Sequence, residues 1–224
     1  MSNISKLFDN DNKAILLINV GKSHRGKSYF VKFFLMDGFA RNKFSFGLVF
    51  SGTAFNKDYN FLPSKSIFGE YDQDILEQYV ENLKKIKEDK GTVPGNFVLF
   101  EDCQGLLDNQ TKFFVNWISM YRHLSTSIIF NQQYLLGKNA ISPIIRNQTT
   151  HCLAFNSKTK RTIENLYQNF GQMFETEKEF KEYFLNITKE QHVGMLYIEK
   201  EDDINKNYLP IIAPGEYPTY KISY

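Results

Sequence analysis

Cysteine and histidine are scarce in this chain of 224 residues. Cys103 and Cys152 are the two cysteines, and they lie in or beside apolar segments, without the close spacing of a zinc site or a disulfide framework. The four histidines, His24, His123, His151 and His192, show no paired metal-ligand spacing. These absences argue against a zinc protein and a disulfide-stabilised scaffold, and they predict two buried free thiols.

Long apolar runs are also missing. No stretch approaches the roughly 18 uninterrupted apolar residues of a membrane span, and Asp9 and Asp11 lie where a secretory signal would be apolar. Lys and Arg number 27 against 25 Asp and Glu, so the composition by itself indicates no nucleic-acid partner. We therefore expect a soluble, non-secreted protein in which any DNA contact is local.

Short apolar segments alternate with helical patterns along the chain. The expected strands are 14–20, 46–50, 96–102, 127–130 and 151–155. The expected helices begin at Lys27, after Asp72 or Asp74, near Phe113 with an end around His123, near Ile163 and after the capping-box pattern of Thr176 and Glu179. From Gly194 onward the pattern predicts an edge strand or hairpin and then a tail. Such alternation is typical of an α/β fold, a mainly parallel sheet with helices on both faces.

The segment Gly21–Ser28 has the sequence GKSHRGKS and fits the phosphate-loop template G-x-x-x-x-G-K-[ST], directly after an apolar strand pattern. In such a loop the backbone N–H groups surround the phosphates, while Lys27 reaches the outer phosphates and Ser28 holds Mg²⁺. The motif predicts that the chain binds ATP with Mg²⁺. The expected nucleotide-binding residues are Gly21, Lys22, Ser23, His24, Arg25, Gly26, Lys27, Ser28 and Tyr29.

Two carboxylates, Glu101 and Asp102, end the apolar segment 96–102. ATP hydrolysis requires one group that holds Mg²⁺, usually through water, and another that polarises the attacking water. The usual order has Asp in the metal position, so Glu101 departs from the pattern. We predict that Glu101 binds Mg²⁺ together with Ser28; which carboxylate activates water stays open, as does the alternative that the pair merely begins a loop.

Three further polar residues are candidates for catalysis. Gln132 would lie beside the γ-phosphate if its strand separates the phosphate-loop strand from the acidic-pair strand, and Gln133 competes for this role. Arg122 and Arg146 are each either an arginine finger that acts across a subunit boundary or a surface arginine in an ion pair. The predicted catalytic set is Lys27, Glu101, Asp102, Gln132, Arg122 and Arg146.

Together these motifs resemble the viral genome-packaging ATPases of the FtsK/HerA superfamily, including the vaccinia-type branch of virophages and polinton-like viruses. The resemblance extends over about residues 14–155. It rests on the phosphate loop, segments 49–53, 59–63 and 67–71, the acidic pair, Arg122-His123 before a strand that ends in Gln132, and segment 143–147.

The resemblance implies a RecA-like P-loop NTPase fold of the ASCE type, with an extra strand between the two nucleotide-binding strands. It also implies a homo-oligomeric ring that threads double-stranded DNA, without sequence preference, into a preformed capsid. Capsid vertex proteins are then further partners. The expected locations are the host cell cytoplasm, a viral factory and the virion.

We expect one P-loop ATPase domain over residues 1–224, with a core at about 14–155 and C-terminal helices, an edge strand and a tail over 156–224. Lys57, Lys65 and the basic segment Lys158–Arg161 are candidate DNA contacts, and for each a solvated surface is the alternative.

Two other functions stay open. A P-loop nucleotide or nucleoside kinase would use the same loop, but it usually needs a lid with several arginines, and the arginines here are few and scattered. A nucleotide-dependent switch that hydrolyses ATP poorly would be consistent with the departure at Glu101. DNA-stimulated hydrolysis would favour the motor over both.

Overall fold

The computed structural model describes residues 14–53, 57–103, 111–136, 141–198, 203–213 and 221–224. Its strands are β1 (Leu16–Val20), β2 (Phe46–Ser51), β3 (Ile67–Phe68), β4 (Asn96–Glu101), β5 (Thr126–Gln132), β6 (His151–Phe155), β7 (Val193–Ile198) and β8 (Tyr208–Ile212). Its α-helices are α1 (Lys27–Ala40), α2 (Gln73–Lys90), α3 (Lys112–Met120), α4 (Pro143–Asn147), α5 (Lys160–Phe170), α6 (Glu177–Ile187) and α7 (Ile204–Asn207). Short 3-10 turns occupy Ser64–Ser66 and Tyr121–Leu124.

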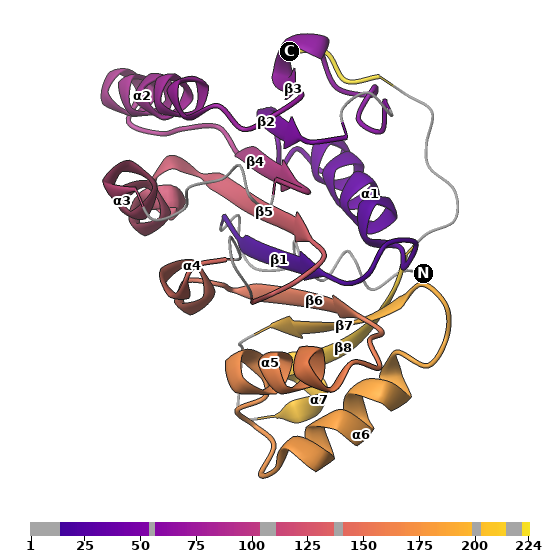
Figure 1. Ribbon diagram of the computed structural model, residues 1–224. Coiled ribbons are helices and arrows are strands. Elements are labelled where there is room, and N and C mark those ends of the chain that lie inside the picture. Colours follow the sequence, from indigo (N-terminus) through magenta and orange to yellow (C-terminus); the bar gives the residue numbers. More distant parts are fainter. Residues whose placement is uncertain (1–13, 54–56, 104–110, 137–140, 199–202, 214–220) are drawn as a thin grey trace.

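The strands of the described residues form one eight-stranded sheet in the order β3-β2-β4-β5-β1-β6-β7-β8 (Figure 1). Strands β3 to β6 in this order pair in parallel, whereas β7 and β8 are antiparallel to their neighbours. The predicted α/β fold with a mainly parallel sheet is therefore confirmed. The expected C-terminal hairpin is formed by β7 and β8.

Strand β5 lies between β1 and β4, as the resemblance implied. In this register Val20 is opposite Gln132, and Asn131 is opposite Glu101. Because the three strands are parallel, their carboxyl ends meet at one edge of the sheet, where ligands bind in open α/β sheets. The phosphate loop, the acidic pair and Gln132 thus converge at this edge.

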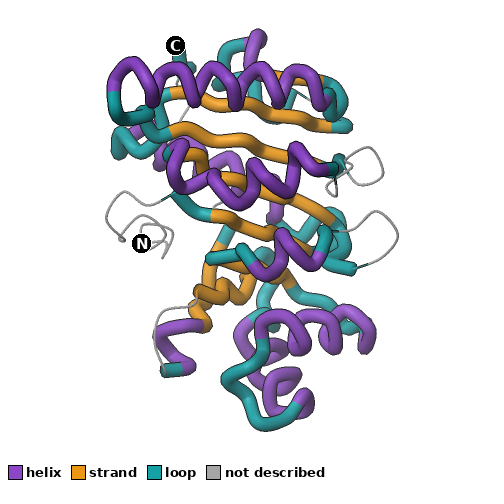
Figure 2. The backbone as a smooth tube through the Cα atoms, turned by 90° about the vertical axis from the view of Figure 1, so that its left-hand side faces the viewer, coloured by secondary structure: helices purple, strands orange, loops and turns teal. Residues whose placement is uncertain are grey.

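The two faces of the sheet are covered unequally. Helices α2, α3, α4 and α5 lie on one face, and α1 is the α-helix that the described residues place on the other (Figure 1). Figure 2 views the first face, with its helices in front of the strands. The larger core cluster lies beneath these helices and α6, and a second cluster lies beneath α1.

The last residues of the chain return to the α1 face at the opposite edge from β8. The Tyr224 ring stacks on Phe39 with centroids 6.0 Å apart, and its hydroxyl donates to the Gly47 carbonyl oxygen over 3.0 Å. The backbone N–H of Ile222 donates to the Phe61 carbonyl oxygen over 2.6 Å. These contacts help to close the sparsely covered face.

Local capping explains where α2 begins and ends and where α6 begins. Asp72, rather than Asp74, caps α2: its carboxylate accepts from the N–H groups of Asp74 and Ile75 over 2.9 and 3.2 Å. Gly91 ends this helix at a φ of 73°, in the left-handed region that favours glycine. The Thr176 hydroxyl caps α6 from the predicted capping-box position.

Two features differ from the sequence prediction. The helix expected to reach about His123 leaves α-geometry after Met120 and continues as a 3-10 turn to Leu124. The two-residue strand β3 was not among the expected strands, and it pairs Ile67 with Val49 of β2. Such a short edge strand has too few residues to show a period of its own.

None of the helices formed by the described residues is long and apolar enough to cross a bilayer.

Both thiols are buried and free, as predicted. Cys103 donates from Sγ to the Phe50 carbonyl oxygen over 3.2 Å, and burial raises the pKa of its thiol to about 12. Burial raises the pKa of Cys152 as well. Neither group has the thiolate character of a nucleophile at neutral pH.

A row of stacked phenylalanines crosses three strands beneath α2 and α3. The Phe100 ring of β4 lies 5.6 Å from Phe50 of β2 and 5.1 Å from Phe130 of β5, with interplanar angles of 14° and 13°. Phe100 also meets Trp117 of α3 edge to face, at 6.2 Å. It is therefore the central packing residue between β4 and its neighbours.

We expect Phe100→Ala to lower the free energy of unfolding by about 3–5 kcal/mol, because it removes ring packing and leaves a cavity. Urea unfolding followed by circular dichroism measures the change. Phe33→Ala, at a partly buried position of α1, should have a smaller effect. Equal losses of unfolding free energy in the two variants would show that the phenylalanine row contributes no more to stability than a partly buried phenylalanine does.

Candidate nucleotide-binding site

The loop between β1 and α1 is closely packed around its two motif glycines. Gly26 has a φ of 104°, a conformation that other residues rarely adopt. A Cβ atom on Gly26 would lie 2.8 Å from the Ala213 Cβ, and one on Gly21 would lie 2.9 Å from the Phe155 Cβ. The loop therefore needs glycine at both positions, and α1 begins directly after it, with its N-terminus facing the loop.

Lys27 is held within this loop. Its Nζ donates to the Lys22 carbonyl oxygen over 3.3 Å, and the residue is only 7% exposed. Burial lowers the pKa of the ammonium group, while the charges of Asp102 and Glu101 oppose this effect. An ammonium group whose partner is a neutral carbonyl can bind a phosphate oxygen more strongly than it binds that carbonyl.

Asn19, a polar residue inside β1, ties the strand to the helix. Its Nδ2 donates to the Lys27 carbonyl oxygen over 3.1 Å. The bond fixes the first turn of α1 relative to the end of β1, and so it fixes the position from which the Lys27 and Ser28 side chains extend.

The carboxylate of Glu101 accepts three hydrogen bonds. Ser28 donates from Oγ to Oε1 over 2.8 Å. Oε2 accepts from the Tyr59 hydroxyl over 2.6 Å and from Asn131 Nδ2. Glu101 is 3% exposed, and burial raises its pKa, although the three donors act to lower it. The longer side chain of glutamate thus reaches the motif serine at the position where aspartate is usual.

Asp102 is held differently. Its backbone has a φ of 48°, and its N–H donates to the Asn131 carbonyl oxygen over 3.0 Å. Within the described part of the chain its carboxylate accepts no hydrogen bond. Burial raises the pKa of this carboxyl, and the charge of Lys27 opposes the shift. Of the two carboxylates, Asp102 is the one whose oxygens are not already engaged.

Gln132 lies at the carboxyl edge of the sheet, beside the phosphate loop. It is buried at the end of β5, and its carbonyl oxygen accepts from the N–H of Gly21, the first loop residue, over 3.3 Å. Gln133, the competing candidate, is partly buried one position beyond the strand. The structure brings both glutamines to the carboxyl edge, and Gln132 is in direct backbone contact with the loop.

Arg122 and Arg146 lie at the other edge. They precede β5 and β6, so they are placed where the parallel strands begin, whereas the phosphate loop lies where they end. A five-residue strand such as β1 spans roughly 16 Å. The structure therefore does not bring either arginine to the phosphate loop of its own chain.

Each arginine has partners within the chain. Arg122 donates from Nε to the Tyr121 hydroxyl over 3.0 Å and lies over that ring. Arg146 donates from Nε to Asn169 Oδ1 over 2.8 Å and from Nη1 to the Ile141 carbonyl oxygen, and burial lowers its pKa. A role at ATP would require either arginine to act on a neighbouring subunit.

Three residues of the site were not assigned a role from the sequence: Asn19, Tyr59 and Asn131. The available signal for the asparagines is a polar residue inside an otherwise apolar strand. Tyr59 belongs to segment 59–63, which contributed to the family resemblance. Nothing local connects it to Glu101, which is 42 residues away.

The donor set fits Mg²⁺ and ATP. The Ser28 hydroxyl and the Glu101 carboxylate supply adjacent hard oxygens, the ligands that Mg²⁺ prefers. Asn19 Oδ1 and Asn131 Oδ1 are buried without a hydrogen-bond partner. Such unpaired acceptors are a feature of sites that a ligand or its water completes.

The sequence of the chain was compared with those of known protein families and proteins. No protein-family model matches the chain. Its sequence is 24% identical over 195 residues to the uncharacterized protein 075L of invertebrate iridescent virus 6, which covers 84% of this chain and 72% of that protein.

Among solved structures, the genome packaging NTPase B204 of Sulfolobus turreted icosahedral virus 2 is similar. Its sulfate complex has a TM-score of 0.64 at 16% identity and covers 92% of this chain and 100% of that chain. Its ATP-γS complex has a TM-score of 0.61 at 14% identity, with coverage of 88% and 96%. EssC (ATPases 2 and 3) from Geobacillus thermodenitrificans has a TM-score of 0.57 at 12% identity, with coverage of 93% and 41%. These similarities confirm the predicted RecA-like P-loop NTPase fold.

The Tyr59 hydroxyl gives a specific test of the site. Tyr59→Phe keeps the ring and removes one donor to Glu101, so we expect the Mg²⁺ concentration that supports half-maximal ATP binding to rise by about 10–100-fold, as for other residues that orient metal ligands. Titration of a fluorescent ATP analogue at varied Mg²⁺ measures this effect.

The matched control is Tyr79→Phe. It also removes a hydroxyl that donates a hydrogen bond, here to Asn96 Oδ1 over 3.0 Å, at the opposite end of β4 from Glu101. It should leave the Mg²⁺ dependence unchanged. If both variants have the parental Mg²⁺ dependence, Tyr59 does not orient the Glu101 carboxylate.

Proposed function

We propose that this chain, which has the fold of viral genome-packaging NTPases, is an ATP-hydrolysing motor that moves double-stranded DNA into a preformed capsid. The observation that carries the proposal is the hydrogen bond from the phosphate-loop residue Ser28 to Glu101 at the end of a strand two places away. The motif resemblance and the similarity to a viral protein support the packaging role.

ATP would bind with its phosphates in the loop. The loop N–H groups and the Lys27 ammonium face the phosphate oxygens, and Ser28 and Glu101 hold Mg²⁺. When bound, Mg²⁺ neutralises charge on the phosphates and fixes their geometry. Tyr59 and Asn131 keep the Glu101 carboxylate oriented toward Ser28.

Hydrolysis then needs a base. We assign this role to Asp102, because its carboxylate is not engaged by other described residues and lies close enough to Lys27 for their charges to interact. Water attacks the γ-phosphorus and passes a proton to an oxygen of Asp102 as the bond to the β-phosphate oxygen breaks. Gln132, beside the loop, orients the water or contacts the γ-phosphate.

The placement of the arginines supports a ring. Arg122 and Arg146 lie away from their own loop, and a neighbouring copy is what could bring one of them to bound ATP. A finger supplied in this way links hydrolysis to motion between subunits. We further propose that the ring holds DNA through backbone contacts, docks to capsid vertex proteins, and acts in the host cytoplasm or viral factory, with retention in the virion as a further possibility to test.

The deciding experiment is steady-state ATP hydrolysis by the full chain with and without long double-stranded DNA. We expect several-fold stimulation by DNA, and no turnover by Lys27→Ala, which removes the ammonium group while the circular dichroism spectrum stays parental. Lys27-dependent phosphate transfer to a nucleoside would instead identify a kinase. Tight ATP binding with negligible turnover would identify a switch, and either result would overturn the motor.

A second prediction concerns the finger. Arg146→Ala should bind ATP with parental affinity but lose hydrolysis. A mixture of Arg146→Ala and Lys27→Ala should recover part of the activity, since an interface with the loop of the first variant and the arginine of the second is intact. Each variant alone and the mixture are assayed at equal total concentration.

The control for this prediction is Asn169→Ala, which removes a hydrogen-bond partner of Arg146 and keeps the arginine. It should retain hydrolysis. Parental activity of Arg146→Ala, or a mixture no more active than its parts, would remove Arg146 from the catalytic set and leave Arg122 as the candidate.

A further inference from the structure

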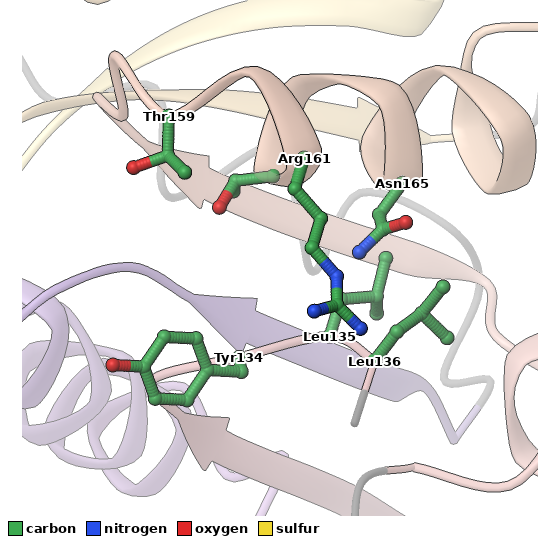
Figure 3. Close-up of a pocket in the computed structure, with 7 residues that line it drawn as sticks. Tyr134, Leu135, Leu136, Thr159, Arg161 and Asn165 are labelled. Atoms are coloured by element: carbon green, nitrogen blue, oxygen red, sulfur yellow. The ribbon is translucent and has the colours of Figure 1, made fainter.

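A cavity of about 310 Å³ lies at the carboxyl edge of the sheet, and its lining residues do not belong to the phosphate loop. Its lining residues are Tyr134, Leu135, Leu136, Thr159, Arg161, Thr162 and Asn165 (Figure 3). The first three follow β5 and the others begin α5, which follows β6. Leu135 belongs to the core beneath α2 to α6, so the cavity is on the face opposite to α1.

Positive charge and hydrogen-bond donors line one side of this cavity. The Arg161 guanidinium extends from α5 toward Leu135 and Leu136 (Figure 3). Within the described part of the chain it forms no ion pair and no hydrogen bond. A planar guanidinium without a partner matches the geometry of a phosphate group.

The surroundings of Arg161 favour an anion as well. Lys158 and Lys160 are exposed beside it, and Lys160 is 3.5 Å from Glu164 in an exposed pair. The Thr159 side chain does not cap α5, and among the described residues the N–H groups of Lys160 and Arg161 have no acceptor, whereas that of Thr162 donates to the Thr159 carbonyl oxygen over 3.0 Å. Exposed lysines on both sides of Thr159 suit an extended polyanion better than a single small ion.

The cavity is connected to the ATP site through one short segment. Tyr134, which is 56% exposed, lies two residues after Gln132. The Gln132 carbonyl oxygen contacts Gly21 of the phosphate loop, and the preceding Asn131 donates to Glu101. A ligand that contacts Tyr134, Leu135 or Leu136 therefore bears on the strand end that carries Gln132.

We propose that this cavity binds a backbone phosphate of the translocated DNA through Arg161, and that its occupancy acts on ATP hydrolysis through the segment from Asn131 to Leu136. The inference rests on the proposed function. It adds a DNA contact on α5 and a route by which DNA stimulates the ATP site.

The test compares Arg161→Gln with Arg41→Gln in the assembled full chain. Arg41 is an exposed arginine paired with Asp37 at the end of α1, and it serves as the matched charge change. DNA affinity is measured by fluorescence anisotropy, with labelled duplexes of two unrelated sequences over a range of salt concentrations. ATP affinity and DNA-stimulated hydrolysis are measured in parallel.

We expect Arg161→Gln to weaken binding of both duplexes several-fold and to reduce the salt slope by about 1, the value for one lost phosphate contact. Stimulation of hydrolysis at saturating DNA should also fall. Arg41→Gln should match the parent in all three measurements.

Each other result overturns a definite part of the inference. Parental DNA affinity in Arg161→Gln would show that Arg161 does not contact DNA. Weaker ATP binding with unchanged DNA binding would assign the cavity to a phosphate of the nucleotide. Parental stimulation of ATP hydrolysis in Arg161→Gln at saturating DNA would show that the cavity is not coupled to the ATP site through Tyr134. If the parent itself binds no DNA, the proposed function fails, and this inference fails with it.

Discussion

The buried carboxylate of Glu101 is the group on which the arrangement of the site depends. An ionised group removed from water is strongly destabilising unless hydrogen bonds replace its hydration. Here the donors are Ser28 at the start of α1, Tyr59 after β2 and Asn131 near the end of β5. Strand β4 must therefore lie beside β5, and β5 beside β1, for one carboxylate to be satisfied. The strand order and the position of Glu101 beside Ser28 of the phosphate loop satisfy the same constraint.

The unequal cover of the sheet gives its two faces different roles. The α1 face carries one long helix and is completed by returning segments: Lys32 pairs with Asp58 at 2.5 Å, and Ile222 bonds to Phe61. These contacts place the segment of Tyr59 against α1. The position of Tyr59, which donates to Glu101, is thus supported by α1 and by the last described residues. The other face, thick with helices, contributes the cavity around Arg161.

The two edges of the sheet are also distinct. At the carboxyl edge the end of β5 contacts the phosphate loop through Gln132 and continues into the segment that lines the neighbouring cavity. At the amino edge Arg122 and Arg146 are held by partners of their own chain. The phosphate loop and the two arginines thus lie at opposite edges, which is why the proposed ring assigns the arginines to the ATP of an adjacent copy.

The sequence by itself determined the phosphate loop, the apolar strands, the acidic pair and the position of Gln132, because each depends on residue types at short spacing. Other features depended on tertiary structure. The choice of Asp72 over Asp74 depended on the backbone geometry at the start of α2, and the pairing of β3 required a strand that is distant in the chain. Ser28 and Tyr59 reach Glu101 across 73 and 42 residues. Local patterns specify which groups a segment carries, whereas only the packed sheet decides which of those groups meet.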